Sequence, residues 1–379
     1  MSEYQYYEFQ AIDRPLSDKE MRELRSYSTR ARITATSFVN NYSWGGFKGD
    51  EDAWMEKYFD AFLYLANWGT HILKVHLPSR LLDPKIATEY CCGDSSFFRE
   101  KDGRVILSFV SEDEEDDDWV EDEGGLSSLI SVRAELARGD LRALYLGWLL
   151  CAQTGDFDDE ELEPPLPSGL GQLSASLESL AEFLRIDSDL LHVAADSSQS
   201  LEDSGLERDD VRRWVASLPS EEKDELLTNI VADGGQAAVN ELLHRFNKEG
   251  SASQTDALPP RRTVGDLLRA AETVAAERLR VEAEKRAEER TRRERETALE
   301  REKHLDSLMG REPKLWAEIE TLIVTKQPKR YDQAIRLLAD LRDLDARAKG
   351  GDFQMRMEAL RQAQARKPTL IERLKKAGL

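Results

Sequence analysis

The sequence predicts an α+β protein: an N-terminal α/β sandwich head, an irregular helical domain, a long charged helix and a C-terminal helical bundle. Apolar and polar residues alternate at several places in the first 110 residues, which is the period of a strand. From about residue 126, apolar residues recur every three or four positions, which is the period of a helix. Residues 263–309 contain no proline, and their middle part is almost entirely Glu, Arg and Lys.

The chain is expected to begin with a strand, a helix and a second strand. Tyr7, Phe9 and Ala11 alternate with polar residues, as in a half-buried strand. Residues 17–20 read Ser-Asp-Lys-Glu, a capping-box pattern that opens a helix running through about Tyr27. Residues 33–42 are rich in β-branched and aromatic side chains and predict the second strand.

The rest of the head adds a helix and two more strands. A Gly-containing turn at 44–49 precedes residues 51–66, whose apolar side chains share one face of a predicted helix. Alternation at 73–77 and 105–109 predicts the third and fourth strands. Four strands with two or three helices on one face form a two-layer sandwich, and we assign it to residues 1–110.

Aromatic residues are dense in this head and allow two interpretations. Aromatic side chains exposed on a sheet stack nucleic-acid bases. Aromatic side chains at strand and helix spacing also build an ordinary core. The neighbouring charges are mostly acidic and would repel phosphates, so we expect a core.

Residues 111–125 are predicted to form an acidic loop. Its carboxylates repel one another and favour an extended, solvated connector, although DNA mimicry or docking of a basic partner is an alternative. The run lacks the ligand spacing of a calcium-binding loop. Trp119 is unusual there because a tryptophan favours a core or a partner. The candidate partner-binding residues of this loop are Asp116, Asp117, Asp118 and Trp119.

Residues 126–249 are predicted to form an acidic helical domain of short amphipathic helices. The first helical stretch, 126–153, is broken at Gly139, and a Pro/Gly-rich loop follows at 162–171. Further helices are expected at 173–186, 188–195, 207–217, 220–232 and 236–248. The composition of residues 250–262 is that of a linker.

The long charged helix is assigned to 263–309. Glu282, Glu288 and Glu289 each precede an arginine by four residues, and such pairs contribute a few tenths of a kcal/mol each. The helix is interpreted as a spacer or lever, or as a coiled coil with a partner. An apolar heptad seam fades after Val281, which makes an extended coiled coil the weaker interpretation.

Charge is distributed unevenly along the chain. The net charge is −21, but residues 1–260 carry 24 basic and 52 acidic residues, whereas residues 261–379 carry 29 and 22. An acidic body repels nucleic acid. The mildly basic remainder is suited to nucleic acid, to an acidic partner or to the acidic part of the chain itself.

Residues 310–379 are predicted to form a C-terminal helical docking module. Apolar faces at 315–323, 331–344 and 353–360 predict three helices, and Thr369–Glu372 reads as a capping box that opens a fourth through Lys376. The candidate partner-binding residues of this module are Trp316, Lys329, Arg330 and Tyr331.

Several stretches of this module also resemble a known family. These are Leu315-Trp316, residues 325–334, residues 337–344 and residues 366–379. They resemble the C-terminal module of bacterial SWIM zinc-finger family proteins, and residues 4–70 are similar to bacterial proteins without an assigned activity. The zinc finger itself is absent, because Cys91-Cys92 and Cys151 do not supply a Cys-x-Cys and Cys-x-His pair. The resemblance implies a shared docking or assembly module, without the metal or a zinc-linked nucleic-acid role.

The sequence contains none of the common nucleotide-binding or catalytic motifs. It contains no phosphate-binding loop, dinucleotide turn or nucleophile elbow. His71 and His76 lie five residues apart on one predicted strand and therefore point to opposite faces. Cys91 and Cys92 have no basic neighbour that would lower a thiol pKa, so we expect packing. We predict no catalytic, cofactor-binding or metal-binding residues and no cofactor.

The expected location is the cytoplasm. Three cysteines are too few for a disulfide framework, no apolar run is long enough to span a membrane, and no secretory signal is expected at the start.

Two hypotheses follow. The first is a non-enzymatic scaffold or accessory subunit of a bacterial multiprotein system, which binds one or more proteins through its acidic body and C-terminal module. The second is a nucleic-acid-associated component that binds through Arg261-Arg262, Arg286–Arg295 and Lys367–Lys376. An enzyme with an unrecognised site is a third.

Overall fold

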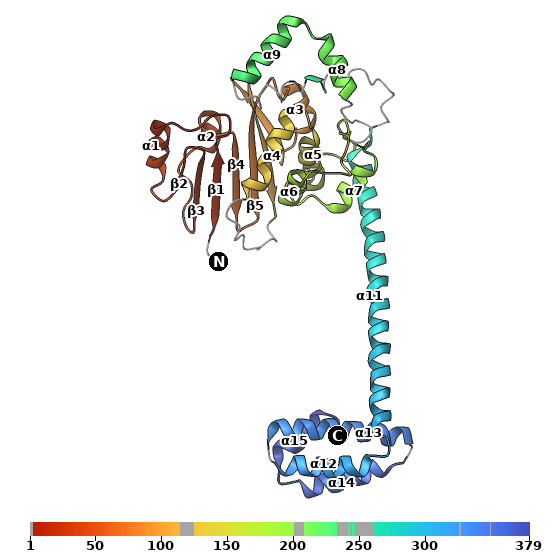
Figure 1. Cartoon of the computed structure of the whole chain (residues 1–379). Helices are drawn as coiled ribbons and strands as arrows, with labels where there is room; N and C mark the ends of the chain where they lie inside the picture. Colours follow the sequence, from red (N-terminus) through yellow and green to blue (C-terminus); the bar gives the residue numbers. More distant parts are fainter. Residues whose placement is uncertain are drawn as a thin grey trace. The chain divides into compact units, whose positions relative to one another are not determined.

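The chain folds into two compact units, residues 1–278 and 279–379, in a computed structural model (Figure 1). The structure describes residues 3–113, 125–200, 208–232, 242, 245–246, 261–325, 327–348 and 350–379. The predicted α+β class is confirmed. Most of the predicted helix at 236–248 and of the linker at 250–262 lies outside the described residues.

Unit 1 is built on a seven-stranded antiparallel sheet with the order β2-β3-β1-β4-β5-β7-β6. The N-terminal strand lies inside the sheet, where Phe9 faces Phe38 on one side and Phe62 on the other. The strands are β1 (Gln5–Gln10), β2 (Arg32–Ile33), β3 (Ser37–Tyr42), β4 (Ala61–Ala66), β5 (Thr70–Pro78), β6 (Ser96–Lys101) and β7 (Arg104–Glu112).

Both faces of the sheet are covered. The helices of unit 1 within the described residues are α1 (Asp18–Tyr27), α2 (Glu51–Lys57), α3 (Pro84–Tyr90), α4 (Leu126–Ala137), α5 (Arg142–Thr154), α6 (Ala175–Phe183), α7 (Ser188–Asp196), α8 (Arg208–Ser217) and α9 (Ser220–Ala232). On one face, α4 packs on β4 and β5, while α3 and α5 pack on β6. On the other face, Leu24 of α1 and Trp54 of α2 join a separate, aromatic-rich core. A helical layer is therefore present on each face, where the sequence predicted one.

The predicted helix at 51–66 is wrong in its second half. The helix ends at Lys57, and residues 61–66 form β4, the central strand. All six residues of β4 are buried, so the strand lacks the polar alternation that identifies a half-buried strand. Asp60 separates the two elements, and its side chain accepts the N–H groups of Ile12 and Asp13 at 2.7 and 2.9 Å.

The sheet and helices α4–α7 share one hydrophobic core. Leu73 and Leu107 of the sheet belong to the same buried cluster as Leu144 of α5 and Leu180 of α6. The sequence predicts a separate head at 1–110 and helical domain from 126, but the described parts of both belong to unit 1. The predicted break at Gly139 is confirmed between α4 and α5.

Helix α11 (Val264–Leu308) belongs to both units. Val264, Leu267 and Ala271 are buried in the core of unit 1. Leu305 and Leu308 are buried in the core of unit 2. Residues 283–300, which we call the connector segment, are exposed on all sides of the helix.

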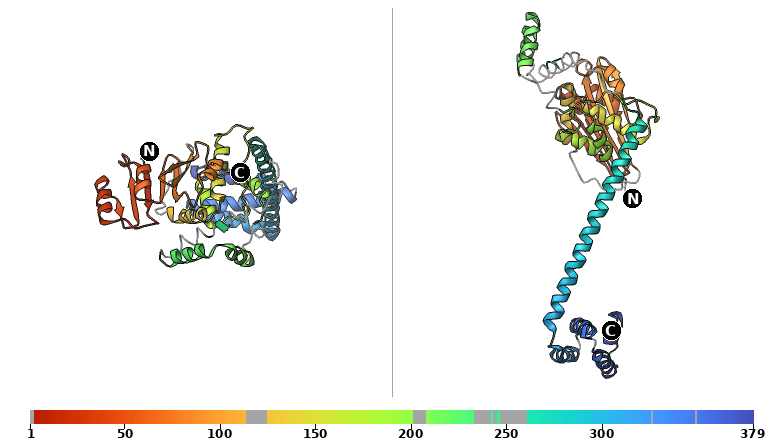
Figure 2. Two further views of the ribbon diagram at one scale, coloured as in Figure 1. Left: turned by 90° about the horizontal axis from the view of Figure 1, so that it is seen from above. Right: turned by 90° about the vertical axis from the view of Figure 1, so that its right-hand side faces the viewer.

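Unit 2 is completed by α12 (Glu312–Val324), α13 (Pro328–Ala348), α14 (Asp352–Ala363) and α15 (Pro368–Lys376). Figure 2 shows these helices from two further directions. The predicted capping box at Thr369–Glu372 is wrong, because α15 begins at Pro368 and no side chain caps its N-terminus. Proline is well suited to the first helical position, since its fixed φ fits the helix and its missing N–H would have no helical partner.

Candidate functional site

The predicted partner-binding residues fall into two groups. Asp116, Asp117, Asp118 and Trp119 lie outside the described residues. The other four residues lie in the bundle of unit 2, where the structure separates core positions from surface positions.

Tyr331 and Trp316 contribute to the bundle core. Tyr331 is only 5% exposed. Trp316 is half-buried and packs against Phe353, with 6.0 Å between the ring centroids. The Arg356 guanidinium lies 5.8 Å from the centre of the Trp316 ring, within the range of a cation–π contact. Packing accounts for both aromatic residues.

Lys329 and Arg330 occupy the first turn of α13 and are exposed. Arg330 Nη1 donates a hydrogen bond to Gln333 Oε1 at 3.0 Å. These two cations remain on the surface as candidates for binding.

Two contacts bring further cations to the same end of the bundle. Lys367 Nζ donates to the carbonyl of Ile323, in the last turn of α12, at 3.0 Å. Arg373 of α15 donates to the carbonyl of Pro328 at 3.4 Å and forms an ion pair with Asp332. Arg366 precedes Lys367 and is exposed. We call Lys329, Arg330, Arg366, Lys367 and Arg373 the basic end of the bundle.

The sequence predicts the two parts of the basic end separately. Lys329 and Arg330 are candidate partner-binding residues, whereas Lys367–Lys376 is a candidate nucleic-acid stretch. Their proximity depends on the packing of α15 against α13, which no local pattern reveals.

The C-terminal part of α11 is attached to the bundle by a polar cluster. Asp340 of α13 is 6% exposed and pairs with Arg301 and with His304, whose Nε2 lies 3.0 Å from the carboxylate. Arg301 also binds Asp343 at 2.7 Å. Burial would raise the pKa of Asp343, but hydrogen bonds from Arg301 and Arg342 outweigh it and lower that pKa. Two helices are therefore joined by charge as well as by apolar packing.

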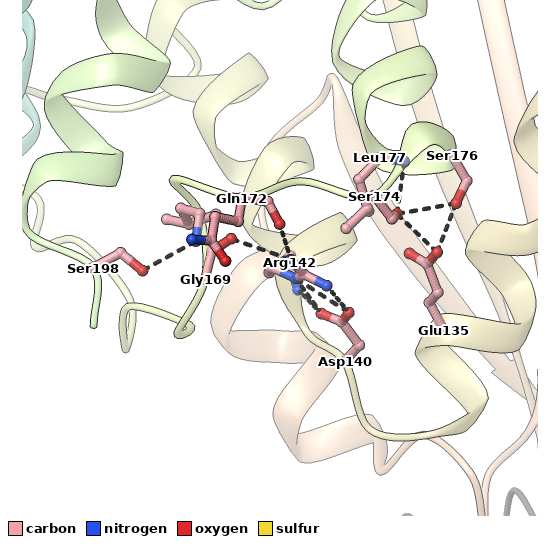
Figure 3. A network of polar contacts seen from close by, with 10 residues as sticks. Glu135, Asp140, Arg142, Gly169, Gln172, Ser174, Ser176, Leu177 and Ser198 are labelled. Carbon is pink, nitrogen blue, oxygen red and sulfur yellow. Dashed lines mark hydrogen bonds and ion pairs between the residues drawn. The ribbon is translucent and has the colours of Figure 1, made fainter. Parts of the chain in front are cut away.

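In unit 1, a buried arginine holds the Pro/Gly-rich loop. Arg142 binds the Asp140 carboxylate at 2.6 Å and donates to the carbonyls of Gly169 and Gln172 at 3.1 and 2.9 Å (Figure 3). Ser198 fixes the same loop, because its Oγ accepts the N–H of Leu170 at 3.1 Å. This network orders the chain between α5 and α6.

A second network lies beside it. Glu135 Oε1 accepts hydrogen bonds from Ser174 and Ser176 at 2.8 and 2.6 Å, which ties α4 to the start of α6 (Figure 3). A surface hollow of about 420 Å³ lies along these helices and is lined by Ser128, Ser131, Glu135, Arg138, Ser176 and Ser179, among others. The Glu135 carboxylate serves the helix–helix contact.

An ion pair between a half-buried arginine and a buried glutamate anchors the start of α11 to unit 1. Arg262 donates hydrogen bonds to both carboxylate oxygens of Glu163, at 2.9 and 2.8 Å, and the Tyr145 hydroxyl donates a hydrogen bond to the same carboxylate. Burial and the Glu163 charge hold the pKa of Tyr145 well above its ordinary value. Arg278, further along α11, binds Asp189 at 2.8 Å.

This geometry bears on the cations proposed for nucleic-acid binding. Arg262 is engaged with Glu163. In the connector segment and the turn before it, four arginines pair with glutamates one helical turn away, namely Arg286–Glu282, Arg290–Glu294, Arg292–Glu296 and Arg293–Glu289. Glutamates on the same helix therefore neutralise most of the positive charge of these four arginines.

The aromatic residues of the head are mostly core, as predicted. Tyr7, Phe9, Trp54 and Phe62 are buried together on one face of the sheet, whereas Trp44 is 72% exposed. Lys74 lies among them, only 8% exposed, and binds Asp52 of α2 at 2.6 Å. This ion pair holds α2 on the sheet.

His71, His76 and Cys91 of unit 1 are engaged in packing. His71 and His76 lie on opposite faces of β5, as predicted, because His71 stacks on Phe183 whereas His76 Nδ1 lies 3.3 Å from the carbonyl of Phe59. Burial raises the pKa of the Cys91 thiol to about 12. Cys92 differs from the expected packing because it is exposed.

The described part of the chain has neither a metal-binding cluster nor a membrane-spanning helix. No group of three or more His, Cys, Asp and Glu side chains is arranged to hold a metal ion. None of its helices combines the length and the apolar character that crossing a membrane requires.

Comparison with family models, with characterised proteins and with solved structures found no match to this chain.

Proposed function

We propose that this protein is a scaffold or accessory subunit that binds partner proteins through the bundle of unit 2 and through the acidic body of unit 1. The proposal includes a place in a bacterial multiprotein system and in the cytoplasm. Three free cysteines, two of them buried, are consistent with a reducing compartment.

The observation that supports this function best is the construction of α11. One end of the helix is buried in the core of unit 1 and the other in the core of unit 2, while residues 283–300 are exposed and belong to neither core. Intrahelical ion pairs support this segment, so it requires no partner helix to stay helical. A continuous helix that joins two independent cores is suited to linking two binding surfaces.

The polar clusters of unit 1 support the same proposal. Arg142, Glu163 and Lys74 are each bound to segments of unit 1 itself, and each of these contacts fixes one element on another. These contacts therefore stabilise the fold of unit 1.

Affinity purification with the tagged full-length protein and with a fragment ending at residue 300 tests the proposal. The fragment keeps the core of unit 1 and lacks the bundle. Protein partners that survive nuclease and are lost with the fragment would support a scaffold that binds through the bundle. Recovery of nucleic acid alone would contradict the proposal, and recovery of the same proteins with both baits would assign their binding to the acidic body of unit 1 and not to the bundle.

A further inference from the structure

The basic end of the bundle carries cations from three parts of unit 2. Lys329 and Arg330 come from the start of α13, Arg366 and Lys367 from the connection before α15, and Arg373 from α15 itself. The contacts of Lys367 with Ile323 and of Arg373 with Pro328 fix these parts against each other. The cations are therefore placed by the fold of the bundle.

Their charge is only partly balanced. Arg373 is paired with Asp332. Within the described residues, no carboxylate lies within ion-pair distance of Lys329, Arg330 or Arg366, in contrast to the paired arginines of the connector segment. The N-termini of α13 and α15 lie at this end together with the C-terminus of α12, so their helix dipoles largely offset one another and the side chains supply the positive charge.

An exposed apolar residue adjoins these cations. Val324, the last residue of α12, is 70% exposed and directly follows Ile323, whose carbonyl binds Lys367. A complementary ligand therefore offers several negative charges together with an apolar side chain.

An acidic polypeptide fits this description better than a nucleic acid does. The phosphate backbone has no apolar group for Val324, and the connector-segment arginines that could extend a longer phosphate-binding track are paired with glutamates. A short acidic segment concentrates its charge at the basic end alone, where opposite potentials set orientation and speed of association.

We propose that the basic end of the bundle binds an acidic segment of a partner protein, with Val324 contacting an apolar residue of that segment. This inference rests on the proposed scaffold function and specifies one of its binding surfaces. It predicts binding that weakens as salt concentration rises, because exposed charges are screened.

The probe is a short fluorescein-labelled peptide of Asp and Glu with one central leucine. Its affinity for the full-length protein is measured by fluorescence anisotropy at two salt concentrations. We expect the Lys329→Glu, Arg330→Glu, Arg366→Glu triple variant to bind at least about tenfold more weakly, since it removes three cations and adds three carboxylates. Val324→Ser is expected to weaken binding by about two- to fourfold.

The matched control reverses three exposed charges elsewhere in the bundle, Arg311→Glu and Lys314→Glu at the start of α12 and Arg336→Glu in α13. It makes the same change in net charge and is expected to weaken binding by less than about threefold. Circular dichroism and thermal unfolding establish that both variants keep their helices.

The proposal is overturned by an equal loss in both triple variants, by no binding of the peptide at low salt, or by tighter binding of a DNA duplex than of the peptide. Protein partners that the full-length chain captures equally well with and without the basic-end substitutions would leave the scaffold function standing while removing this surface from it.

Discussion

At the scale of single residues, the stability of unit 1 depends on a few polar side chains that fasten one segment to another. Glu163 is the strongest example, because it is 4% exposed and its carboxylate accepts hydrogen bonds from both Arg262 and Tyr145. Glu20 is an example at the surface, where it closes the capping box of α1 with Ser17 and binds Arg14 at 2.7 Å.

Breaking the Arg262–Glu163 pair is expected to be costly. Arg262→Met leaves the Glu163 carboxylate buried without its cation and should lower the free energy of unfolding of unit 1 by about 3 kcal/mol. The double variant Arg262→Met, Glu163→Met should lose much less than the sum of the single variants, since it leaves no unpaired charge. Urea unfolding of the four proteins measures this coupling, and additive losses would show that the pair has no special role.

Glu20 should contribute a defined part of the pH dependence. Hydrogen bonds from Arg14 and Ser17 lower its pKa from 4.5 to about 2. The carboxylate therefore stabilises the fold fully above pH 4.5, and this contribution disappears as the pH falls to about 2. The difference in unfolding free energy between the wild type and Glu20→Gln should shrink across that window, and a constant difference would contradict the assignment.

At the scale of elements, helices are stabilised in two different ways. Most are fixed by an apolar face, as α13 is by Leu338 and Leu341. The connector segment of α11 has no such face and depends on helix-forming residues and on pairs such as Arg293–Glu289.

Ala287→Pro should therefore act locally. Proline in the interior of an exposed helix costs about 3 kcal/mol, which the connector segment cannot recover through packing. We expect new protease cleavage within residues 283–300, with unchanged thermal midpoints for both units. Ala287→Ser is the control and should remain resistant. A shift of several degrees in either midpoint would show that this segment contributes to a core.

Sequence patterns predict those elements that have one buried face. The capping box at Ser17 and the break at Gly139 follow from local chemistry, and the structure has both. β4 was missed because a strand buried on both faces shows no alternation. The sequence predicts the cations of the basic end but not their proximity, because Arg373 and Pro328 are in contact although 45 residues separate them in the sequence.

At the scale of the whole molecule, the chain contains two cores that share no buried residue and are joined by one helix. The cluster around the sheet includes α11 only as far as Ala271 among its buried residues, and the bundle cluster begins at Leu305. The cooperativity of unfolding within each unit should therefore not extend to the other.

Each unit should fold alone. We expect fragments 1–282 and 283–379 to be folded, and the calorimetric trace of the full chain to equal the sum of their traces. The reason is that each fragment keeps its complete described core. A single transition in the full chain at a temperature absent from both fragments would contradict this expectation.

The burial of Val264, Leu267 and Ala271 in unit 1 has a consequence for biosynthesis. The sheet emerges from the ribosome before α11, so the apolar surface that receives these three side chains stays uncovered until residues 264–271 have left the ribosome. Nascent chains that stall or terminate before this point expose that surface to chaperones and proteases. The start of α11 therefore completes the core of unit 1. Chaperones and proteases would recognise a chain that lacks it before unit 2 is made.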